Sequence, residues 1–438
     1  MIQTIDLRGQ TPSRAELATV VPRADTDVTV AAEAAAALVE AVRVDGLAAL
    51  RSQAERFDGG APEHVRVPQQ HLDEALAGLD PAVRAALEET ISRVRQATAA
   101  QIPDARVTTL ADGAVVEQRW HPVERVGLYV PGGKAVYPSS VVMNVVPAQL
   151  AGVGSLAIAS PPQKEFGGRV HPTVLGAAAL LGVTEVYAVG GAGAIGALAH
   201  GVAEIGLEPV EVITGPGNVF VAAAKRVVRG LVGIDSEAGP TEILIVADAS
   251  ADAAFVAADL VSQAEHDELA AAVLVTDSVE LAEAVQRELA GAAATTTHAE
   301  RVAVALDGPQ SAIVLVDSIE AACAFSNAYG PEHLELQTAD PDATLAGIHN
   351  AGAIFVGAYS PVSLGDYLAG SNHVLPTGGQ SRFSSGLGAY TFLRPQQLIR
   401  YDRGALREVA DRIVALADAE NLPAHGDAVT ARFRSGDS

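Results

Sequence analysis

From Ser155 onward, short apolar runs alternate with stretches in which apolar residues recur at helical spacing. Repeated strand–helix–strand units build parallel β-sheets covered by helices, so this alternation restricts the chain to an α/β architecture. We expect two series of strands, near 155–160, 185–190, 210–214 and 242–248, and near 271–276, 311–316, 334–338 and 353–357. The helices between them are expected near 171–183, 193–204, 217–229, 251–266, 278–290, 318–329 and 341–350.

The segments outside this alternation have a different character. Residues 31–100 are rich in Ala, Leu and Arg at helical spacing, the segment after Gly357 is rich in loop-forming residues, and a helical tail is expected from about Pro395. The tail has too little apolar surface for an independent core, so we expect it to pack on the rest of the chain or on a second subunit. The predicted fold is α/β, with two adjacent Rossmann-like (incomplete) parallel-sheet domains and helical N-terminal and C-terminal extensions.

These expectations define approximate domain boundaries. The predicted parts are an N-terminal extension, a first α/β domain with a helical N-terminal part, a second α/β domain and a C-terminal helical tail. The N-terminal extension covers residues 1–25, and the first α/β domain covers residues 26–128 together with 238–380. The second α/β domain covers residues 129–237, and the tail covers residues 381–438.

The charge and the cysteine content exclude several classes of function. The chain has 29 basic and 53 acidic side chains, a net charge of -24, so nucleic acid and anionic membrane surfaces are expected to be repelled. Its one cysteine, Cys323, rules out an internal disulfide framework and a cysteine metal cluster, and reads as core filler in an apolar helical stretch. The first ten residues carry no signal-peptide core, and no apolar run has the length of a membrane span, so a cytoplasmic protein is expected.

Two short motifs place polar side chains next to secondary-structure ends. In SQAEH, Gln263 and His266 stand three residues apart on a helix end and could converge on one ion, although a histidine bonded to last-turn carbonyls is the simpler reading. In GPEHL, Glu332 and His333 follow a helix stop and precede a strand. They could act as a general-base pair, or they could be solvated residues of a capped turn, and the motif alone does not decide.

Two further segments could contribute ligands. The loop SLGDYLAGSNHVLPTGG is long, polar and glycine-rich, and it contains Asp366 and His373, both plausible ligands. The segment NLPAHGDAVTAR places Glu420 and His425 around a proline break. By itself that segment reads as an ordinary turn between two helices.

Two glycine-rich loops follow expected strands. The loop GGAGAIGALAHG spells G-x-G-x-x-G with Gly191, Gly193 and Gly196, and Glu211 lies twenty positions after Gly191 as a formal ribose ligand. The second loop, TGPGNVFVAAAKR, also places glycine at a strand-to-helix turn, where a phosphate can approach backbone N–H groups. Tight packing of a small-residue helix against its neighbours explains the first loop equally well.

Taken together, these segments resemble one enzyme family. The segments GLYVPGG at 127–133, TGPGN at 214–218, AGPTE at 238–242, SQAEH, GPEHL, GSNHVLPT and PAH occur in the order found in histidinol dehydrogenases. The resemblance runs from about Asp6 to the last helix. It implies a zinc-dependent oxidation of L-histidinol to L-histidine through L-histidinaldehyde, with two NAD molecules as hydride acceptors, in the last steps of histidine biosynthesis.

The resemblance also implies a role for each matching residue. Glu332 would activate the water that attacks the aldehyde, and His333 would be the general base for the alcohol and the hydrated aldehyde. One zinc ion per subunit would be held by Gln263, His266, Asp366 and His425. The substrate would be bound by these four residues and by His333, Thr241, His373 and Glu420. Most of the zinc and catalytic residues fall in the first predicted α/β domain.

The second predicted α/β domain would be the cofactor side. Tyr129 and Asn218 match family positions that contact NAD, whereas Gly193 stands where the family usually has a glutamine. The formal G-x-G-x-x-G exists only because of that difference, so we do not read it as a dinucleotide fingerprint.

The resemblance implies a homodimer in which the tail supplies Glu420 and His425 to the neighbouring subunit. Two other readings are a related zinc and NAD dehydrogenase acting on another small polyol, and a two-lobed solute-binding protein. An anionic polyol would be a poor partner for Glu420. The missing export signal and the adjacent Glu332 and His333 count against the solute-binding protein.

Overall fold

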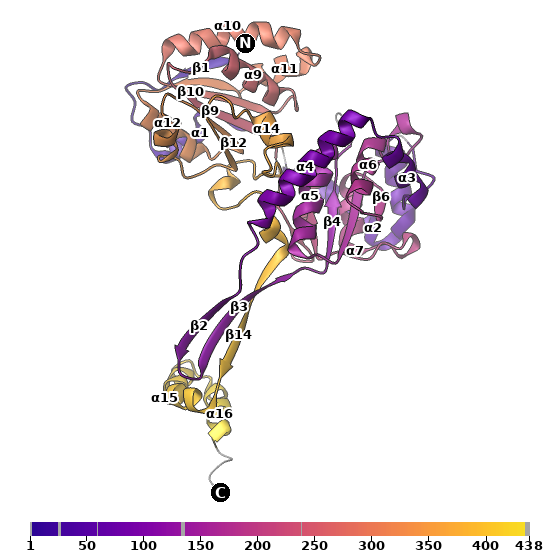
Figure 1. Ribbon diagram of the computed structural model, residues 1–438, viewed down its shortest axis with the longest axis vertical. Coiled ribbons are helices and arrows are strands. Elements are labelled where there is room, and N and C mark those ends of the chain that lie inside the picture. The colour runs from indigo at the N-terminus through magenta and orange to yellow at the C-terminus, as the bar shows by residue number, and fades with distance from the viewer. Residues whose placement is uncertain (1, 25–27, 59, 133–135, 238, 434–438) are drawn as a thin grey trace. The chain divides into compact units, whose positions relative to one another are not determined.

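The computed structural model describes residues 2–24, 28–58, 60–132, 136–237 and 239–433 (Figure 1). The chain divides into two compact units. Unit 1 comprises Met1–Gln101 and Val123–Phe392, and unit 2 comprises Ile102–Pro122 and Leu393–Ser438. Among the residues described, no helix has the length and apolarity needed to cross a membrane.

The first sheet of unit 1 has five strands, all parallel, in the order β6-β5-β4-β7-β8. Its strands are β4 (Arg125–Tyr129), β5 (Ser155–Ser160), β6 (Val186–Ala188), β7 (Val212–Thr214) and β8 (Gly233–Ile234). The helices between them are α5 (Pro138–Ala151), α6 (Pro172–Leu180), α7 (Gly191–His200) and α8 (Val219–Val228). Parallel strands buried by helices on their faces explain why the strand segments read as short, continuous apolar runs.

The second sheet of unit 1 has six parallel strands in the order β1-β11-β10-β9-β12-β13. Its strands are β1 (Gln3–Asp6), β9 (Glu242–Ala247), β10 (Ala271–Thr276), β11 (Ala312–Leu315), β12 (His333–Gln337) and β13 (Ala353–Val356). Its helices are α1 (Arg14–Val20), α9 (Ala253–Ala264), α10 (Val279–Thr295), α11 (Ala299–Asp307), α12 (Ile319–Tyr329), α13 (Pro341–Leu345) and α14 (Val362–Tyr367). Two parallel sheets with helices between their strands confirm the predicted fold class.

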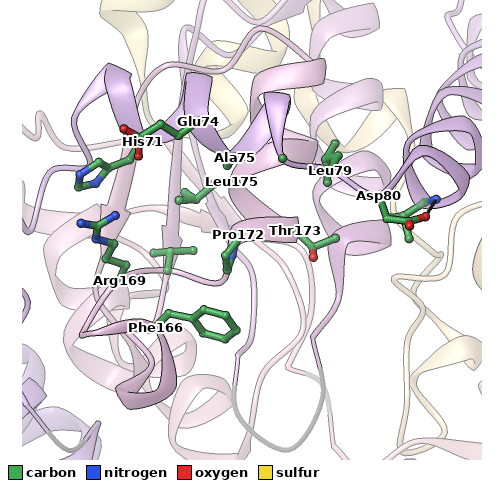
Figure 2. Close-up of a pocket in the computed structure, with 13 residues that line it drawn as sticks. His71, Glu74, Ala75, Leu79, Asp80, Phe166, Arg169, Pro172, Thr173 and Leu175 are labelled. Carbon is green, nitrogen blue, oxygen red and sulfur yellow. Dashed lines mark hydrogen bonds between the residues drawn. The ribbon is translucent and has the colours of Figure 1, made fainter.

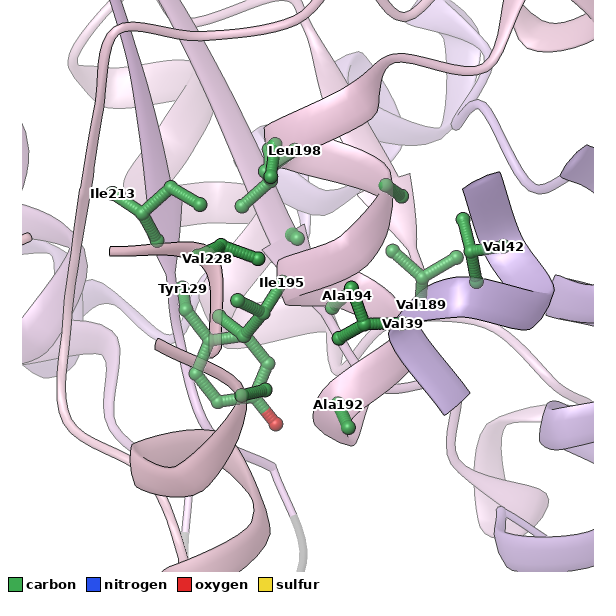
Figure 3. Close-up of a cluster of buried hydrophobic side chains, with 14 of the residues drawn as sticks. Val39, Val42, Tyr129, Val189, Ala192, Ala194, Ile195, Leu198, Ile213 and Val228 are labelled. Carbon is green, nitrogen blue, oxygen red and sulfur yellow. The ribbon is translucent and has the colours of Figure 1, made fainter. Parts of the chain in front are cut away.

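Three N-terminal helices belong with the five-stranded sheet. They are α2 (Val28–Phe57), α3 (Gln69–Ala77) and α4 (Pro81–Ala99). Helix α2 packs on α7 and α8, α3 on α6, and α4 on α5. Side chains of α2, such as Val39 and Val42, lie in one buried cluster with those of α7 (Figure 3). The helix is broken at Gly46, whose φ of 51° is a left-handed conformation that glycine adopts readily.

Unit 2 is built from two segments that are far apart in the sequence. Its three strands are β2 (Arg106–Ala111), β3 (Ala114–Pro122) and β14 (Leu393–Tyr401), paired antiparallel in the order β14-β3-β2. The helices α15 (Arg403–Ala419) and α16 (Pro423–Thr430) follow. The prediction of helix from about Pro395 was therefore wrong for its first residues. They form a strand because β3 supplies a pairing partner that local sequence does not reveal.

Short 3-10 helices occur at the connections of both units. They are η1 (Lys164–Phe166), η2 (Ala203–Ile205), η3 (Gln380–Arg382), η4 (Ala389–Phe392) and η5 (Ala431–Phe433). Cys323 is buried in α12 as a free thiol, as expected of core filler.

Candidate active site

Two strands at the centre of the six-stranded sheet bring the polar motifs together. The chain adds β10 and β11 on one side of β9 and then β12 and β13 on the other, so β9 and β12 are neighbours. Their register pairs His333 with Ile243. Thr241 directly precedes β9 and Glu332 directly precedes β12, so the two residues meet at the same amino-terminal edge of the sheet.

Glu332 is the centre of a short hydrogen-bonded chain. The hydroxyl of Thr241 donates to Glu332 Oε2 at 2.5 Å, and the backbone N–H of Glu242 donates to the same oxygen at 3.0 Å. The Gln263 amide in turn donates to Thr241 Oγ1 at 2.7 Å. Gln263, at the end of α9, is therefore connected to Glu332 through one threonine.

Burial controls the ionisation of Glu332. Its side chain is enclosed by protein, and this desolvation raises the pKa of the carboxyl to about 8, against the opposing effect of the bonds from Thr241 and Glu242. A carboxyl in this state changes charge near neutral to mildly alkaline pH. The reading of Glu332 as a solvated turn residue is excluded.

His333, the first residue of β12, is a neutral base in this environment. Burial lowers the pKa of its imidazole, and Nδ1 lies 3.2 Å from the carbonyl oxygen of Glu242. A carbonyl can only accept, so Nδ1 carries the proton and Nε2 keeps its lone pair. Nδ1 also lies 3.6 Å from Glu332 Oε2. The two adjacent side chains thus offer one titratable carboxyl and one imidazole acceptor.

Glu242 holds this edge of the sheet in place. Its carboxylate accepts from Arg23 Nε at 2.9 Å and from the Gly378 N–H at 2.7 Å, and its backbone contacts both Glu332 and His333. The sequence reasoning did not single out this residue. The signal was present in AGPTE, where an acidic residue directly precedes the apolar run of a buried strand.

The long glycine-rich loop joins the two sheets of unit 1. His373 Nδ1 lies 3.0 Å from the carbonyl oxygen of Asp366 in α14, and His373 Nε2 lies 3.1 Å from Ser140 Oγ in α5. The Asn372 amide donates to the Met143 carbonyl at 2.6 Å. The loop is thereby fixed between a helix of one sheet and a helix of the other.

Electrostatic effects place the remaining unit 1 candidates near each other. Burial is the main cause that lowers the pKa of His373. The charge of Asp366 opposes this shift, and those of His333 and His266 add to it. Burial lowers the pKa of His333 and raises that of Glu332, and the nearby charge of Asp366 opposes the first shift while that of His266 opposes the second. The predicted residues from three separate motifs therefore form one site.

The donors of this site suit a metal ion that also needs ligands from elsewhere. Gln263 Oε1 is buried and has no hydrogen-bond partner among the described residues, which is costly for an amide oxygen unless a ligand completes it. Within the described ranges, no group of three or more His, Cys, Asp or Glu side chains is arranged to hold a metal. Unit 1 offers two predicted ligands of those types, His266 and Asp366, beside the Gln263 amide.

Glu420 and His425 belong to unit 2. Glu420 caps the C-terminal end of α15, and His425 lies in the first turn of α16. Both side chains are exposed. The other seven residues predicted for catalysis, metal binding and substrate binding all lie in unit 1.

The cofactor candidates lie at the topological switch point of the five-stranded sheet. The chain adds β5 and β6 on one side of β4 and β7 on the other, and ligands commonly bind beyond the carboxyl ends of two such strands. Tyr129 ends β4, and its buried hydroxyl accepts from the Gly191 N–H at 3.2 Å. This burial raises the pKa of Tyr129 to about 12. Asn218 follows β7 and caps α8, with Oδ1 accepting from the N–H groups of Phe220 and Val221 at 3.0 and 3.2 Å.

Helix packing explains part of the glycine pattern in α7. A Cβ on Gly196 would lie 3.1 Å from the Val39 Cα of α2, and a Cβ on Gly193 would meet the end of the Gln53 side chain. Figure 3 shows Val39 and Val42 of α2 beside Ala192 and Ala194 of α7. Gly191 has open space where a Cβ would lie, and its φ is 59°. Gly193 and Gly196 thus allow the contact between α7 and α2, which was one of the two interpretations of the sequence.

A separate cavity of about 330 Å³ lies between α3 and α6 (Figure 2). Its lining includes His71, Glu74, Arg169 and Thr173, and none of the predicted site residues contributes to it. The cavity is therefore no part of the candidate active site.

Comparisons with known proteins agree over nearly the whole chain. The sequence profile of a family described as histidinol dehydrogenase matches residues 21–433. The chain is 70% identical to histidinol dehydrogenase of Leifsonia xyli over 99% of both chains, and 60% identical to that of Nocardia farcinica over 98% of both. The crystal structure of histidinol dehydrogenase from Elizabethkingia anophelis superposes with a TM-score of 0.92 at 31% identity, covering 99% of this chain and 98% of that one.

Proposed function

Because the chain belongs to the histidinol dehydrogenase family, we propose that its unit 1 site oxidises L-histidinol to L-histidine in two successive steps. The enzyme is a zinc- and NAD-dependent oxidoreductase of histidine biosynthesis, and histidinol is its substrate. The observation that carries the assignment of the chemistry to this site is the buried pair of Glu332 and His333, with one ionisable carboxyl beside one neutral imidazole.

The proposed zinc ligands are Gln263, His266, Asp366 and His425. The unpaired Gln263 Oε1 supports this set, because a bound cation would complete a buried oxygen that otherwise lacks a partner. Oxygen and nitrogen donors without thiolate suit zinc at a site that also accepts substrate donors. When bound, the ion would hold and orient nitrogen atoms of the substrate.

The chain's own residues carry out the proton transfers. In the alcohol step His333 Nε2 accepts the hydroxyl proton of histidinol, as a hydride passes to NAD from the carbon that bears the hydroxyl group. Glu332, once ionised, removes a proton from the water that adds to the aldehyde carbonyl. The former carbonyl oxygen takes the proton that His333 accepted in the alcohol step, which completes the hydrate and leaves His333 neutral again. His333 then accepts a hydroxyl proton from the hydrate as the second hydride leaves for NAD, which yields the carboxylic acid.

The remaining proposed substrate contacts surround this pair. Thr241 lies between Gln263 and Glu332, and the half-buried His373 is near enough to His333 for the charge of His333 to affect its pKa. Glu420 is proposed to bind the ammonium group of histidinol, since a carboxylate attracts that charge.

Residues 129–237 are proposed as the cofactor side, with Tyr129 and Asn218 as NAD contacts on either side of the switch point. Residues 238–380 are proposed to carry most of the zinc and catalytic residues. At Gly193 no side chain is available for the coenzyme, and the Gln53 carboxamide occupies the neighbouring space.

We also propose that the enzyme acts as a homodimer in which Glu420 and His425 serve the partner's site. Both residues are exposed in unit 2. Large apolar side chains of the same unit are exposed as well, Val107 by 65%, Ile399 by 70% and Leu416 by 66%, as expected of a surface that a second subunit covers. Because the reaction consumes the intracellular coenzyme NAD, the proposal includes a cytoplasmic location.

The test of the function is stoichiometric. Zinc-loaded protein is supplied with L-histidinol and NAD, and NADH and histidine are both quantified. We expect two NADH per histidine, loss of turnover on chelation, and recovery with zinc. No turnover of histidinol by metal-loaded dimer, combined with good turnover of another polyol, would show that the substrate is assigned wrongly.

The raised pKa of Glu332 predicts the pH dependence of the second step. Below its pKa of about 8 the carboxyl is protonated and cannot accept a proton from water. The rate of histidinaldehyde oxidation is therefore expected to rise about tenfold per pH unit below pH 8 and to level off above it. Stopped-flow measurement of NADH formation from the aldehyde tests this, and a rate that falls as pH rises from 6 to 8 would contradict it.

A further inference from the structure

A buried ion pair lies beside the proposed coenzyme site. Lys225 of α8 and Asp235, which follows β8, have side chains exposed by only 2% and 6%. Lys225 Nζ donates to Asp235 Oδ1 at 2.6 Å and to the carbonyl oxygen of Gly215 at 2.5 Å. Asp235 Oδ2 accepts from the N–H of Gly215 at 2.8 Å. Both backbone polar groups of one glycine are thus held by the two opposite charges.

Gly215 occupies a position where the backbone cannot relax. Its φ of 115° is rare for any residue with a side chain, and a Cβ there would collide with the carbonyl oxygen of Tyr129. Gly215 opens the turn that ends at Asn218, the N-cap of α8. The ion pair therefore fixes the point at which the turn carrying Asn218 passes against the last residue of β4.

The charges are not needed to fill the space. Removing an ion pair from water costs free energy, and apolar residues of similar volume commonly stabilise a fold equally well. The pair instead fixes the orientation of the Gly215 backbone, because the ammonium group binds its carbonyl oxygen and the carboxylate binds its N–H. We propose that Lys225 and Asp235 are positioning residues for NAD, which hold the 215–218 turn so that Asn218 and Tyr129 face the coenzyme together.

This inference rests on the proposed NAD contacts of Tyr129 and Asn218. It predicts that loss of the pair weakens coenzyme binding selectively. None of the hydrogen bonds or ion pairs described for Lys225 and Asp235 involves Thr241, Glu332 or His333. Histidinol binding and zinc content should therefore stay near their normal values.

The test uses the double variant Lys225→Met/Asp235→Asn in the zinc-loaded, full-length protein. Both charges are removed together, so that neither is left buried without its partner. The matched control is Arg125→Met/Glu185→Gln, which removes a pair of 12% and 18% exposure at the amino-terminal ends of β4 and β6 in the same sheet. NADH affinity is measured by its fluorescence, alongside the KM for histidinol, the zinc content and the melting temperature.

We expect the dissociation constant of NADH to rise about 10- to 100-fold in Lys225→Met/Asp235→Asn and by less than about twofold in the control. Unchanged NADH affinity, or an equal loss of affinity in both variants, would overturn the proposal. If the double variant does not fold, Asp235→Asn and the conservative Asp235→Glu are compared, and NADH affinity equal to that of the unmodified protein in Asp235→Asn would overturn it. Absence of histidinol turnover in the unmodified protein would instead mean that the proposed function has failed.

Discussion

Replacement of Glu332 by glutamine is expected to slow the oxidation of histidinaldehyde by about 100- to 10,000-fold, while the oxidation of histidinol keeps most of its rate. The amide can still accept bonds from Thr241 and Glu242, but it cannot take a proton from water. His333, the proposed proton acceptor of the alcohol step, is unchanged. The two steps are measured separately by single-turnover NADH formation from histidinol and from histidinaldehyde.

A matched control lies three residues further along the chain, in β12. Glu335 of β12 is also buried with its pKa raised to about 8, but its oxygens accept from Gln337 and from the Val362 N–H. Glu335→Gln should therefore leave the ratio of the two rates unchanged. If Glu332→Gln slows both steps equally, the role of Glu332 is not confined to activating water in the aldehyde step.

Mixed dimers test the proposed sharing of tail residues. The variants His333→Ala and His425→Ala are each expected to be inactive, the first by loss of the proposed base and the second by loss of a proposed zinc ligand. In a dimer with one subunit of each kind, one site combines an intact His333 with the partner's intact His425. Such heterodimers should recover about half of the normal activity, since one of the two symmetric sites is complete.

The heterodimers are isolated with two different affinity tags, and their activity is compared with that of both parent homodimers. A mixture of His333→Ala with His266→Ala serves as the control, because both changes fall in unit 1 and would rescue each other only if unit 1 residues were shared. Absence of rescue in confirmed His333→Ala/His425→Ala heterodimers would mean that each chain supplies its own tail.

Much of the α/β alternation could be predicted because the buried parallel strands are continuous apolar runs. The segments at 155–160 and 271–276 coincide with β5 and β10. Thr241, Gln263 and Glu332 converge because β9 and β12 are neighbours. The resemblance to a family placed these residues in one site, whereas local spacing alone did not. Their hydrogen bonds link residues 91 and 22 positions apart.

The unpredicted parts depend on contacts that are distant in the sequence. Strand β1 pairs with β11, and β14 pairs with β3, across some 300 and 280 residues. The local sequence of a surface helix also does not show which sheet the helix covers. The region 26–128 was assigned to the first predicted domain, whereas α2 packs on α7 and α8 of the five-stranded sheet. A helical pattern shows which face is buried but not what buries it.

The split composition of unit 2 has a consequence for the order in which the protein is made. Strand β3 lies between β2 and β14, and β14 begins at residue 393. During synthesis on the ribosome, β3 therefore keeps an unpaired edge until the residues of β14 have emerged, and such edges favour pairing with other chains. Unit 1 can fold earlier, so the pairing of β14 with β3 is the last step in the formation of unit 2.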